Sequence, residues 1–486
     1  MCDVMIIGGG VIGCAVAREL SRYRLDTILL EKREDVCSGA SKANTAIVHA
    51  GFDAEPGSNK ARYNVLGNAM FEDICRDLDV PFRRNEALVI AREDEDLSVL
   101  EALKQRGEEN GVPGLRIIDR QELRQREPNV SEKAVAALLA PSSGIVCPFR
   151  LTVALAENAA ENGVMFRRNA GVKRIIRESE GWTVELDSGE VIHSQVIVNC
   201  AGVDSARLNN QVSVRRFCIR PRRGEYFLLD KSFSGMFRET IFQLPSEKGK
   251  GVVVVETVDG NILLGPTAED MDPETQLEDN RTTQQGLEQV RKAVLRTWEH
   301  IPDRKFITNF AGVRASSSTG DFVLGEVADA PFFFNAAGIE SPGLTSAPAI
   351  GAELAHAVAQ RLNAQVNENF NPVRKDIKLL REATMEEQKA LIEEDSAYGQ
   401  IICRCEMVTE AEIRQAIRRP VGARSLDGVK RRVRAGAGRC QAGFCAPRVL
   451  EILSEELGRE PCEITKFGGK SNILIGRIGK EGGGNA

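Results

Sequence analysis

Four cysteines near the C-terminal end of the chain are spaced like the ligands of a metal site. Cys403 and Cys405 form a C-x-C pair, and Cys440 and Cys445 form a second pair after 34 intervening residues. Four thiolates can hold a zinc ion or an iron–sulfur cluster. Zinc sites usually place two to four residues inside a pair, so C-x-C is unusual for zinc. Several basic residues lie near the four cysteines, and their charge would offset the negative charge of a cluster. They are Arg404, Lys430, Arg431, Arg432, Arg434 and Arg439.

The first residues of the chain carry the pattern of a dinucleotide-binding site. Gly8, Gly10 and Gly13 follow a short apolar run at G-x-G-x-x-G spacing, and Glu31 ends a second apolar run. Glycines so placed allow a tight turn, close approach of a pyrophosphate and close packing of the following helix. The carboxylate of Glu31 can accept from both ribose hydroxyls. A G-x-G-x-x-G alone is usually a flexible loop, but strand, glycines, helix, second strand and acid occur here in order.

Small residues after three predicted strands suit loops that pass close to a cofactor. Gly39–Ser41, Asn44 and Thr45 directly follow the dinucleotide unit, with a surface turn as the alternative. The strand at 195–202 ends in small residues, and the strand at 332–338 opens into a glycine-containing turn and a helix. A helix N-terminus there can face a partly negative ring.

The elements that must position these residues follow from the hydrophobic periodicity. Apolar runs predict strands over 4–7, 27–30, 88–91, 164–166, 172–175, 182–186, 195–202, 225–229, 251–256, 261–265 and 332–338. Helical spacing of apolar residues predicts helices over 14–22, 60–80, 94–111, 119–127, 150–162, 282–298, 347–362 and 408–418. The last helix begins with Thr409 and Glu412 as a capping box. The pattern predicts an α/β fold with an antiparallel sheet inserted over 214–325.

Composition limits the classes of partner. The 486 residues suffice for two or three domains, and a net charge of -6 argues against nucleic acid. No apolar run approaches the roughly 20 residues of a membrane span. The N-terminus enters the first strand at once, which leaves no room for a signal peptide. We therefore expect a cytoplasmic protein without a disulfide framework.

The N-terminal motifs resemble the glutathione-reductase-type flavoproteins of the D-amino-acid-oxidase superfamily. The resemblance is carried by the glycine turn, Glu31, the Gly39–Ser41 turn, Ala311–Arg314 and the segment 338–345. It implies an α/β, Rossmann-like FAD-binding fold with an inserted antiparallel-sheet substrate domain. The residues implied to contact FAD are Gly8, Gly10, Val11, Ile12, Gly13, Glu31, Lys32, Gly39, Ala40, Ser41, Asn44, Thr45, Val172, Ala201, Gly202, Gly338, Ser341, Gly343, Leu344 and Thr345.

The cysteine spacing resembles the bacterioferritin-associated-ferredoxin-like (BFD-like) domain, which holds a 2Fe–2S cluster. The resemblance implies that Cys403, Cys405, Cys440 and Cys445 are the cluster ligands, and it favours the cluster over zinc. A flavin domain followed by this module resembles the anaerobic-type, FAD-dependent glycerol-3-phosphate dehydrogenase family from residue 3 to about residue 476.

These resemblances imply a division of the chain into successive parts. The FAD-binding domain comprises 1–213, with a mainly helical insertion at about 75–143, and is completed by 326–372. Residues 214–325 form the substrate domain. A linker helix spans 373–396, the small helical 2Fe–2S domain spans 397–455, and 456–486 form a tail. Because residues 479–486 are rich in glycine, we expect them to be disordered.

The implied reaction is the oxidation of sn-glycerol 3-phosphate to dihydroxyacetone phosphate, with hydride passing to flavin and electrons onward through the cluster. In this superfamily the arginine of the Ala-Gly-x-Arg segment commonly anchors the substrate's anionic group, which implies that role for Arg314. His49 is the candidate base or flavin-side contact, because neutral imidazole titrates near working pH. The plain alternatives are a surface ion pair for Arg314 and a backbone hydrogen bond for His49.

Two other functions stay open. His49–Phe52 and Pro56–Ala61 also resemble L-2-hydroxyglutarate dehydrogenases, so the substrate could be a 2-hydroxy acid, or an amino or imino acid. The other is a non-catalytic electron-transfer subunit, which the presence of both His49 and Arg314 disfavours. We expect a small anionic substrate and an electron-acceptor protein as partners. Docking at a membrane through a partner subunit, the acceptor's identity and the oligomeric state are left open.

Overall fold

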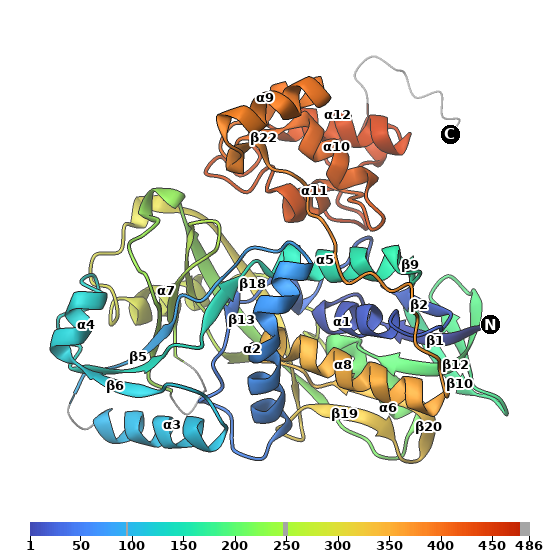
Figure 1. Cartoon of the computed structure of the whole chain (residues 1–486), viewed down its shortest axis with the longest axis horizontal. Coiled ribbons are helices and arrows are strands. Elements are labelled where there is room, and N and C mark those ends of the chain that lie inside the picture. The colour runs from blue at the N-terminus through green and yellow to red at the C-terminus, as the bar shows by residue number, and fades with distance from the viewer. Residues whose placement is uncertain (94–95, 246–250, 477–486) are drawn as a thin grey trace. The chain divides into compact units, whose positions relative to one another are not determined.

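The structure is a computed structural model that describes residues 1–93, 96–245 and 251–476. The predicted helix start at residue 94 and the predicted disordered tail from 479 lie outside the described residues. The chain divides into two compact units (Figure 1). Unit 1 comprises Met1–Lys32 and Val36–Asp376, and unit 2 comprises Arg33–Asp35 and Ile377–Ala486. Among the helices described, none combines the length and apolar character needed to cross a membrane.

The first sheet of unit 1 contains the predicted N-terminal βαβ unit. Its strand order is β10-β11-β12-β1-β2-β9, and β20 joins it beside β12 with β19 next to β20. β1 pairs in parallel with both β2 and β12, and β12 pairs in parallel with β20. Buried parallel strands of this kind form the centre of nucleotide-binding folds. The strands are β1 (Cys2–Ile7), β2 (Thr27–Leu30), β9 (Met165–Arg167), β10 (Val172–Arg177), β11 (Trp182–Leu186), β12 (Val191–Asn199), β19 (Val323–Val327) and β20 (Ala330–Ala337).

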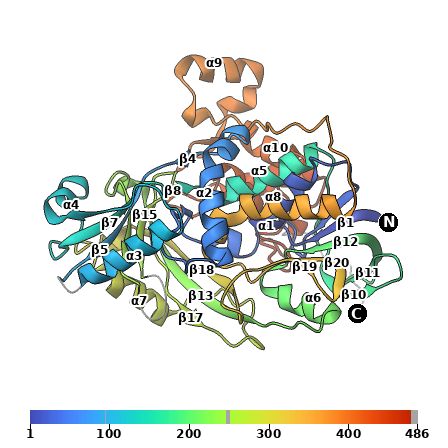
Figure 2. The same ribbon diagram turned by 60° about the horizontal axis from the view of Figure 1, so that its bottom comes forward.

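Three helices pack together against this sheet, with α1 in contact with both α5 and α8 (Figures 1 and 2). Their apolar side chains meet those of β1 in one core, which includes Val4, Ile6, Leu20 and Ile350. Burial of each large aliphatic side chain contributes roughly 1.5–3 kcal/mol, so this core holds the β1–α1 turn in place. The helices around this sheet are α1 (Val11–Leu20), α5 (Pro148–Glu161), α6 (Ser205–Val212) and α8 (Gly343–Arg361).

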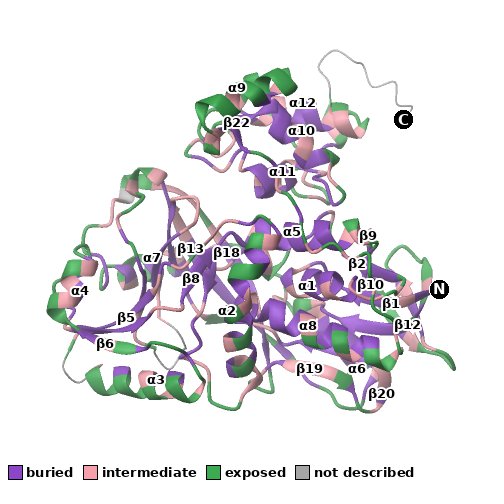
Figure 3. Cartoon of the chain, in the orientation of Figure 1, coloured by how far each residue is buried: buried purple, intermediate pink, exposed green. Residues whose placement is uncertain are grey.

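The second sheet of unit 1 has nine strands in the order β17-β13-β16-β15-β14-β5-β7-β6, with β18 paired to β13. β13 and β18 form a long antiparallel pair from Ile219 opposite Ser317 to Leu229 opposite Phe306. The helices α3 (Leu97–Glu109), α4 (Arg120–Arg126) and α7 (Gln284–Val294) carry exposed outer faces (Figure 3). The strands are β5 (Ala87–Ala91), β6 (Arg116–Asp119), β7 (Ala136–Ala140), β13 (Ile219–Leu229), β14 (Thr240–Gln243), β15 (Val253–Glu256), β16 (Ile262–Gly265), β17 (Glu269–Asp270) and β18 (Phe306–Ser317).

The stretch predicted as a mainly helical insertion, about 75–143, instead supplies three strands of the second sheet. β5 pairs with β7, and β7 pairs with β6. The sequence of β7, Ala136–Ala140, consists only of alanine and leucine, which favour helices in isolation. All five of its residues are buried, so pairing and packing on both faces override local propensity.

A three-stranded sheet and a long helix complete unit 1. The sheet has the order β3-β8-β4 and consists of β3 (Ile47–Val48), β8 (Gly144–Val146) and β4 (Phe82–Arg83). Helix α2 (Asn59–Asp77) crosses and contacts α8, as Figures 1 and 2 show. The two helices approach closely at Gly67, where a Cβ would lie 2.0 Å from the carbonyl oxygen of Thr345.

Unit 2 is a small helical unit. It contains the helices α9 (Met385–Glu394), α10 (Glu410–Arg418), α11 (Leu426–Val433) and α12 (Ala446–Leu457), and the two-stranded sheet β21 (Ile401–Cys403) and β22 (Val408–Thr409). Thr409 and Glu412 form both hydrogen bonds of the predicted capping box at the start of α10. Asp35 is fully buried in this unit and accepts hydrogen bonds from Arg431 and Arg432.

Candidate active site

The glycine turn after β1 is packed too closely for a side chain at two positions. A Cβ on Gly13 would lie 1.9 Å from the carbonyl oxygen of Gly8. A Cβ on Gly8, whose φ is +112°, would lie 2.4 Å from the carbonyl oxygen of Cys200. The turn therefore lies against both α1 and the loop after β12 that contains Ala201 and Gly202. A bare backbone cradle at the start of a helix is what a pyrophosphate requires, so these residues fit FAD.

The predicted turn at 39–41 lies on the N-terminus of α1. The Val11 N–H donates to Ser41 Oγ at 2.9 Å. Asn44 Nδ2 donates to the carbonyl oxygens of Ala40 and Ser41 at 3.3 and 2.9 Å, which closes the turn. The fold thus brings together these predicted cofactor residues: Gly10, Val11, Ile12, Gly39, Ala40, Ser41, Asn44 and Thr45.

Glu31 lies at the end of β2, beside the glycine turn. Its side chain is buried, and its Oε2 accepts a hydrogen bond from the Gly9 N–H at 2.8 Å. The neighbouring Lys32 forms ion pairs with Asp204, at 2.5 Å, and with Glu278. Val172 begins β10 in the same sheet and is buried. Glu31 is therefore fixed at the edge of the cradle.

The main chain of His49 is held from both sides. Its N–H donates to Thr345 Oγ1 at 2.9 Å. Its carbonyl oxygen accepts from Asn64 Nδ2 at 2.8 Å and from Asn68 Nδ2 at 2.9 Å. The imidazole Nε2 lies 3.4 Å from Ser341 Oγ. The main chain of His49 is thus fixed, and its ring lies beside Ser341.

Asn64 and Asn68 are functional candidates that the sequence analysis missed. Both side chains are buried on α2, and both point at one carbonyl oxygen. Their i, i+4 spacing on a helix face was the available signal, since it places two amides side by side.

The segment from Gly338 to Thr345 brings the last set of predicted residues to His49. Gly338 has a φ of +63°, and a Cβ there would lie 2.6 Å from Ser317 Cβ. The Gly343 N–H donates to the carbonyl oxygen of Glu340 at 2.6 Å and begins α8. Leu344 and Thr345 follow in the first turn of this helix. The N-terminus of α8, Ser341 and His49 therefore form one continuous site.

Arg314 extends from β18 directly opposite Arg222 on β13. Residues opposite each other in an antiparallel pair share a face, so both guanidinium groups lie on one side of the sheet. Arg314 Nη2 donates to the carbonyl oxygen of Thr267 at 3.1 Å. On the same strand, Gly312 abuts the predicted cofactor turn, since a Cβ there would lie 2.3 Å from the Ala43 carbonyl oxygen. This contact brings β18 to the cofactor cradle.

Glu340 connects the Arg314 strand to the His49 loop, and the sequence analysis did not identify it. Its carboxylate accepts from Lys60 Nζ at 2.8 Å and from Ser316 Oγ. Burial alone would raise the pKa of Glu340, but Lys60, Ser316 and Arg314 together lower it below its usual value. Glu340 is therefore ionised at neutral pH. The only sequence signal was an acid within a run of small and apolar residues.

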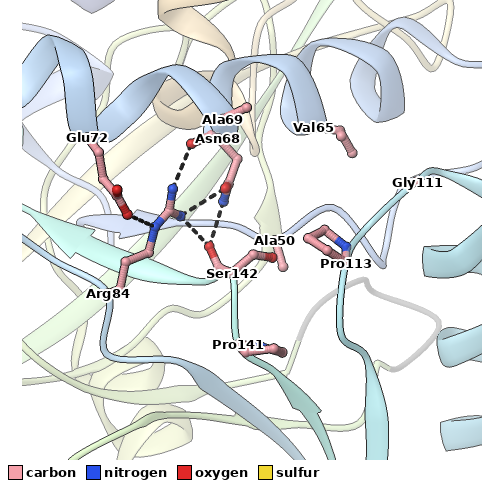
Figure 4. A pocket seen from close by; sticks show the side chains of 10 residues that line it. All are labelled: Ala50, Val65, Asn68, Ala69, Glu72, Arg84, Gly111, Pro113, Pro141 and Ser142. Carbon is pink, nitrogen blue, oxygen red and sulfur yellow. Dashed lines mark hydrogen bonds and ion pairs between the residues drawn. The ribbon is translucent and has the colours of Figure 1, made fainter.

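A cavity of about 430 Å³ lies beside α2 (Figure 4). Arg84 crosses its wall and donates to Asn68 Oδ1 at 2.8 Å and to Glu72 Oε1 at 2.9 Å. Asn68 Nδ2 donates to the Ser142 carbonyl oxygen at 2.9 Å as well as to His49. Arg84 therefore supports the amide that holds His49. The lining residues are Ala50, Val65, Asn68, Ala69, Glu72, Arg84, Gly111, Pro113, Pro141 and Ser142.

The four predicted cysteine ligands lie in two pairs in unit 2. The thiol of Cys403 is hydrogen-bonded to that of Cys445, and Cys405 to Cys440. The bond from Cys445 lowers the pKa of Cys403 to about 6. In the described part of the chain, no group of three or more histidine, cysteine or acidic residues is placed to hold a single metal ion. Two pairs of thiols match the four cysteine ligands of a 2Fe–2S cluster.

Comparisons with known proteins cover nearly the whole chain. Residues 3–357 match the family described as FAD dependent oxidoreductase, and 401–455 match the BFD-like [2Fe-2S] binding domain. A glycerol 3-phosphate dehydrogenase of Caloramator mitchellensis is 46% identical over 479 residues, covering 98% of each chain. The human mitochondrial L-2-hydroxyglutarate dehydrogenase is 30% identical and covers 55% of this chain and 60% of its own.

A solved structure supports the same relationship for unit 1. The dithionite-reduced L-α-glycerophosphate oxidase of Mycoplasma pneumoniae, with FAD bound, has a TM-score of 0.72 and 30% identity. The match covers 76% of this chain and 98% of that one. The sequence-based predictions of an FAD-binding α/β fold, an FAD cofactor and a 2Fe–2S domain are confirmed. This chain belongs to the FAD-dependent oxidoreductase family, in the group of the glycerol-3-phosphate dehydrogenases that carry a C-terminal BFD-like 2Fe–2S domain.

Proposed function

We propose that this protein oxidises sn-glycerol 3-phosphate to dihydroxyacetone phosphate and passes the electrons to a separate acceptor protein. The observation that carries this proposal is the loop Glu340–Ser341. Ser341 lies 3.4 Å from the imidazole of His49, and Glu340 contacts Ser316, two residues after Arg314 on β18. A proton acceptor and an anion-binding arginine are thereby linked through two adjacent residues.

Arg314 would bind the substrate's phosphate. Its planar guanidinium can meet two oxygens at once, and the half-buried position strengthens the interaction. Arg222 lies on the same face and can add a second cation. A phosphate that leaves water requires such pairing, because an unpaired buried charge is costly.

His49 would accept the proton of the substrate's secondary hydroxyl at Nε2. The substrate hydroxyl would take the place of Ser341 Oγ, which lies 3.4 Å from this nitrogen, while Asn64, Asn68 and Thr345 fix the main chain. Removal of this proton helps the carbon to release hydride. When bound, FAD supplies the hydride acceptor, and the 2Fe–2S cluster supplies one-electron transfer.

In this proposal the predicted cofactor residues divide into four sets, according to the part of a cofactor that each would hold. The glycine turn and Ser41 would hold the pyrophosphate, and Glu31 the adenosine ribose. The α8 N-terminus at Gly343–Thr345 would face the flavin ring. Cys403, Cys405, Cys440 and Cys445 would ligate the cluster. The described cysteines form no disulfide with one another, which supports a reducing, cytoplasmic setting.

A second substrate class is supported by the L-2-hydroxyglutarate dehydrogenase relatives. Anaerobic bleaching of the bound flavin distinguishes the two classes. We expect sn-glycerol 3-phosphate to bleach the flavin and L-2-hydroxyglutarate to leave it oxidised. Bleaching by the hydroxy acid alone would reverse the assignment, and bleaching by neither would favour a non-catalytic electron-transfer subunit.

A further inference from the structure

A loop that belongs to the second sheet of unit 1 reaches over to the first sheet. It comprises residues 271–281, which lead from β17 towards α7. Arg223 on β13 holds both ends of this loop. Its guanidinium donates to Glu269 Oε2 at 2.6 Å, just before the loop begins, and to the carbonyl oxygen of Arg281 at 3.2 Å, where the loop ends. The Arg223 side chain is only 6% exposed, so a buried cation fixes the base of the loop.

The far part of the loop contacts residues that follow two strands of the first sheet. Leu277 packs against an apolar cluster that includes Ala206 on α6. The carboxylate of the neighbouring Glu278 accepts a hydrogen bond from Lys32 Nζ, two residues after the end of β2. Lys32 Nζ also donates to Asp204 Oδ2 at 2.5 Å, in the turn after β12. One ammonium therefore joins the loop, β2 and β12.

Lys32 and Asp204 follow strands that lie on opposite sides of β1. In the sheet β1 lies between β12 and β2, and its last residue, Ile7, is paired with Asn199 of β12 and with Leu30 of β2. Neighbouring strands are about 4.8 Å apart, so an ion pair between the residues beyond β2 and β12 spans the carboxyl end of β1. The glycine turn begins at that end, and dinucleotides bind outside the carboxyl ends of parallel strands.

We propose that Lys32, Asp204 and Glu278 form a clasp, an ion cluster that must open before FAD can enter or leave the glycine turn. Glu278 ties the clasp to the loop 271–281, so the second sheet takes part in keeping the cofactor in the first. The clasp consists of contacts within the protein. Breaking it therefore lowers the barrier for entry and for exit alike and leaves the affinity for FAD almost unchanged. The proposal concerns cofactor exchange and is independent of which substrate is oxidised.

Glu278→Gln tests the clasp by removing one of its charges. The rate constant of FAD release is measured on the holoenzyme, by exchange of the bound cofactor for radiolabelled FAD in excess. The dissociation constant is measured on the same holoenzyme, from the fluorescence of free FAD after serial dilution. We expect release to become about 2- to 5-fold faster, the range for one partly exposed ion pair, and the dissociation constant to change less than about twofold. Glu278→Lys should release FAD faster still, because it places a second ammonium beside Lys32.

Salt provides a second measurement of the same contact. A salt concentration of about 1 M shortens the Debye length to roughly 3 Å and weakens exposed ion pairs. It should speed FAD release from the wild type and have less effect on Glu278→Gln, which has already lost the pair. Glu108→Gln is the matched control. Glu108 pairs with Lys104 on α3, with side chains 52% and 31% exposed, against 40% and 38% for Glu278 and Lys32. This variant should match the wild type in release rate and in salt response.

Three results would overturn the proposal. The first is an unchanged release rate in Glu278→Gln. The second is a dissociation constant that rises by the same factor as the release rate, because Glu278 would then stabilise the bound state without closing the path. The third is slower flavin reduction in the FAD-saturated variant together with normal exchange, which would make the loop a brace between the two sheets. We expect flavin reduction in Glu278→Gln to equal that of the wild type once FAD saturates it.

Discussion

Gly224 lies directly against the guanidinium of Arg314. A Cβ at Gly224 would be 2.5 Å from Arg314 Nη2 and 2.9 Å from Pro266 Cβ. Any side chain at this position must therefore displace the guanidinium, because the proline ring and the β-strand behind it cannot move far. Gly224 thus leaves room for the guanidinium of Arg314 in the position that the proposed anion site requires.

Gly224→Ala should therefore weaken substrate binding without loss of FAD. We expect the second-order rate constant of flavin reduction to fall about 10- to 100-fold, mainly because the dissociation constant of the substrate rises. Stopped-flow reduction at several substrate concentrations separates binding from the chemical step. Gly235→Ala is a control for expression and folding, since nothing lies within 4 Å of a Cβ there, although its φ of +79° adds some strain. Unchanged substrate affinity in Gly224→Ala would remove Arg314 from the anion site.

Replacement of Arg314 itself tests the anion site more directly. Arg314→Ala should cost roughly 2–4 kcal/mol of transition-state stabilisation, or about 30- to 1000-fold in the second-order rate constant. Arg314→Lys should recover only part of this loss, because an ammonium cannot contact two oxygens in a fixed plane. The measurement is anaerobic flavin reduction by sn-glycerol 3-phosphate. Equal constants in the wild type and in Arg314→Ala would contradict the assignment.

Asn68→Ala should slow the chemical step more than it weakens binding. The substitution removes one of the two amides that hold the His49 carbonyl oxygen, and it also removes one of the hydrogen-bond acceptors of Arg84. We expect a limiting reduction rate about tenfold lower, with the substrate dissociation constant changed less than about threefold. Asn162→Ala is the matched control, because the amide of Asn162 bonds the carbonyls of Asn158 and Asn371. A purely structural role would lower the melting temperature while leaving the limiting rate of the folded enzyme intact.

Single replacement of a cysteine ligand should separate the two redox centres. Cys405→Ser, for example, should lower the iron and acid-labile sulfide content below two of each per chain. Flavin reduction by substrate should persist, while transfer to an external acceptor stops. Elemental analysis and electron paramagnetic resonance of anaerobic protein provide the measurements, with Cys218→Ser, an exposed cysteine of unit 1, as the control. One zinc per chain and no sulfide in the wild type would refute the cluster.

The stability of unit 2 should depend on pH through Asp35. Burial alone would raise the pKa of Asp35, but Arg432 and Arg431 outweigh it and hold the pKa at about 2, below the ordinary 3.8. The stabilisation is therefore fully present above pH 3.8 and is lost as pH falls towards 2. It amounts to about 2 kcal/mol by linkage. Asp35→Asn should destabilise unit 2 by about 3–5 kcal/mol at neutral pH, because two buried cations lose their partner.

Thermal unfolding followed by far-ultraviolet circular dichroism reports this stability. The transition that includes the helices of unit 2 should shift to lower temperature in the wild type as the pH falls below 3.8. The Asp35→Asn protein should show a lower transition at neutral pH and a weaker acid dependence. Parallel acid dependence in the two proteins would show that other carboxylates govern the transition.

The sequence was sufficient for features that depend on neighbouring residues. The β1–α1 turn, the Glu31 position and the Thr409 capping box are all encoded within about thirty residues. Contacts between distant segments were not accessible in this way. Residues 136–140 form a strand because β5 and β6 flank them, and Glu340 is ionised because Lys60 and Ser316 reach it. No single window of sequence contains those partners, so neither outcome followed from periodicity or composition.

Unit 2 consists of two separate stretches of the chain, so the C-terminal stretch alone does not contain the whole unit. Residues 377–486 contain all four cysteines but lack Asp35, so the same segment produced alone would bury Arg431 and Arg432 without their carboxylate. A fragment that begins at residue 377 therefore lacks part of the electron-transfer unit, although the order of the domains in the sequence suggests that it could be separated there. A recombination event that exchanged only this tail between relatives would have to preserve an acid at position 35. Because Arg33–Asp35 belong to unit 2 but lie within the sequence of unit 1, the two units are constrained to evolve together.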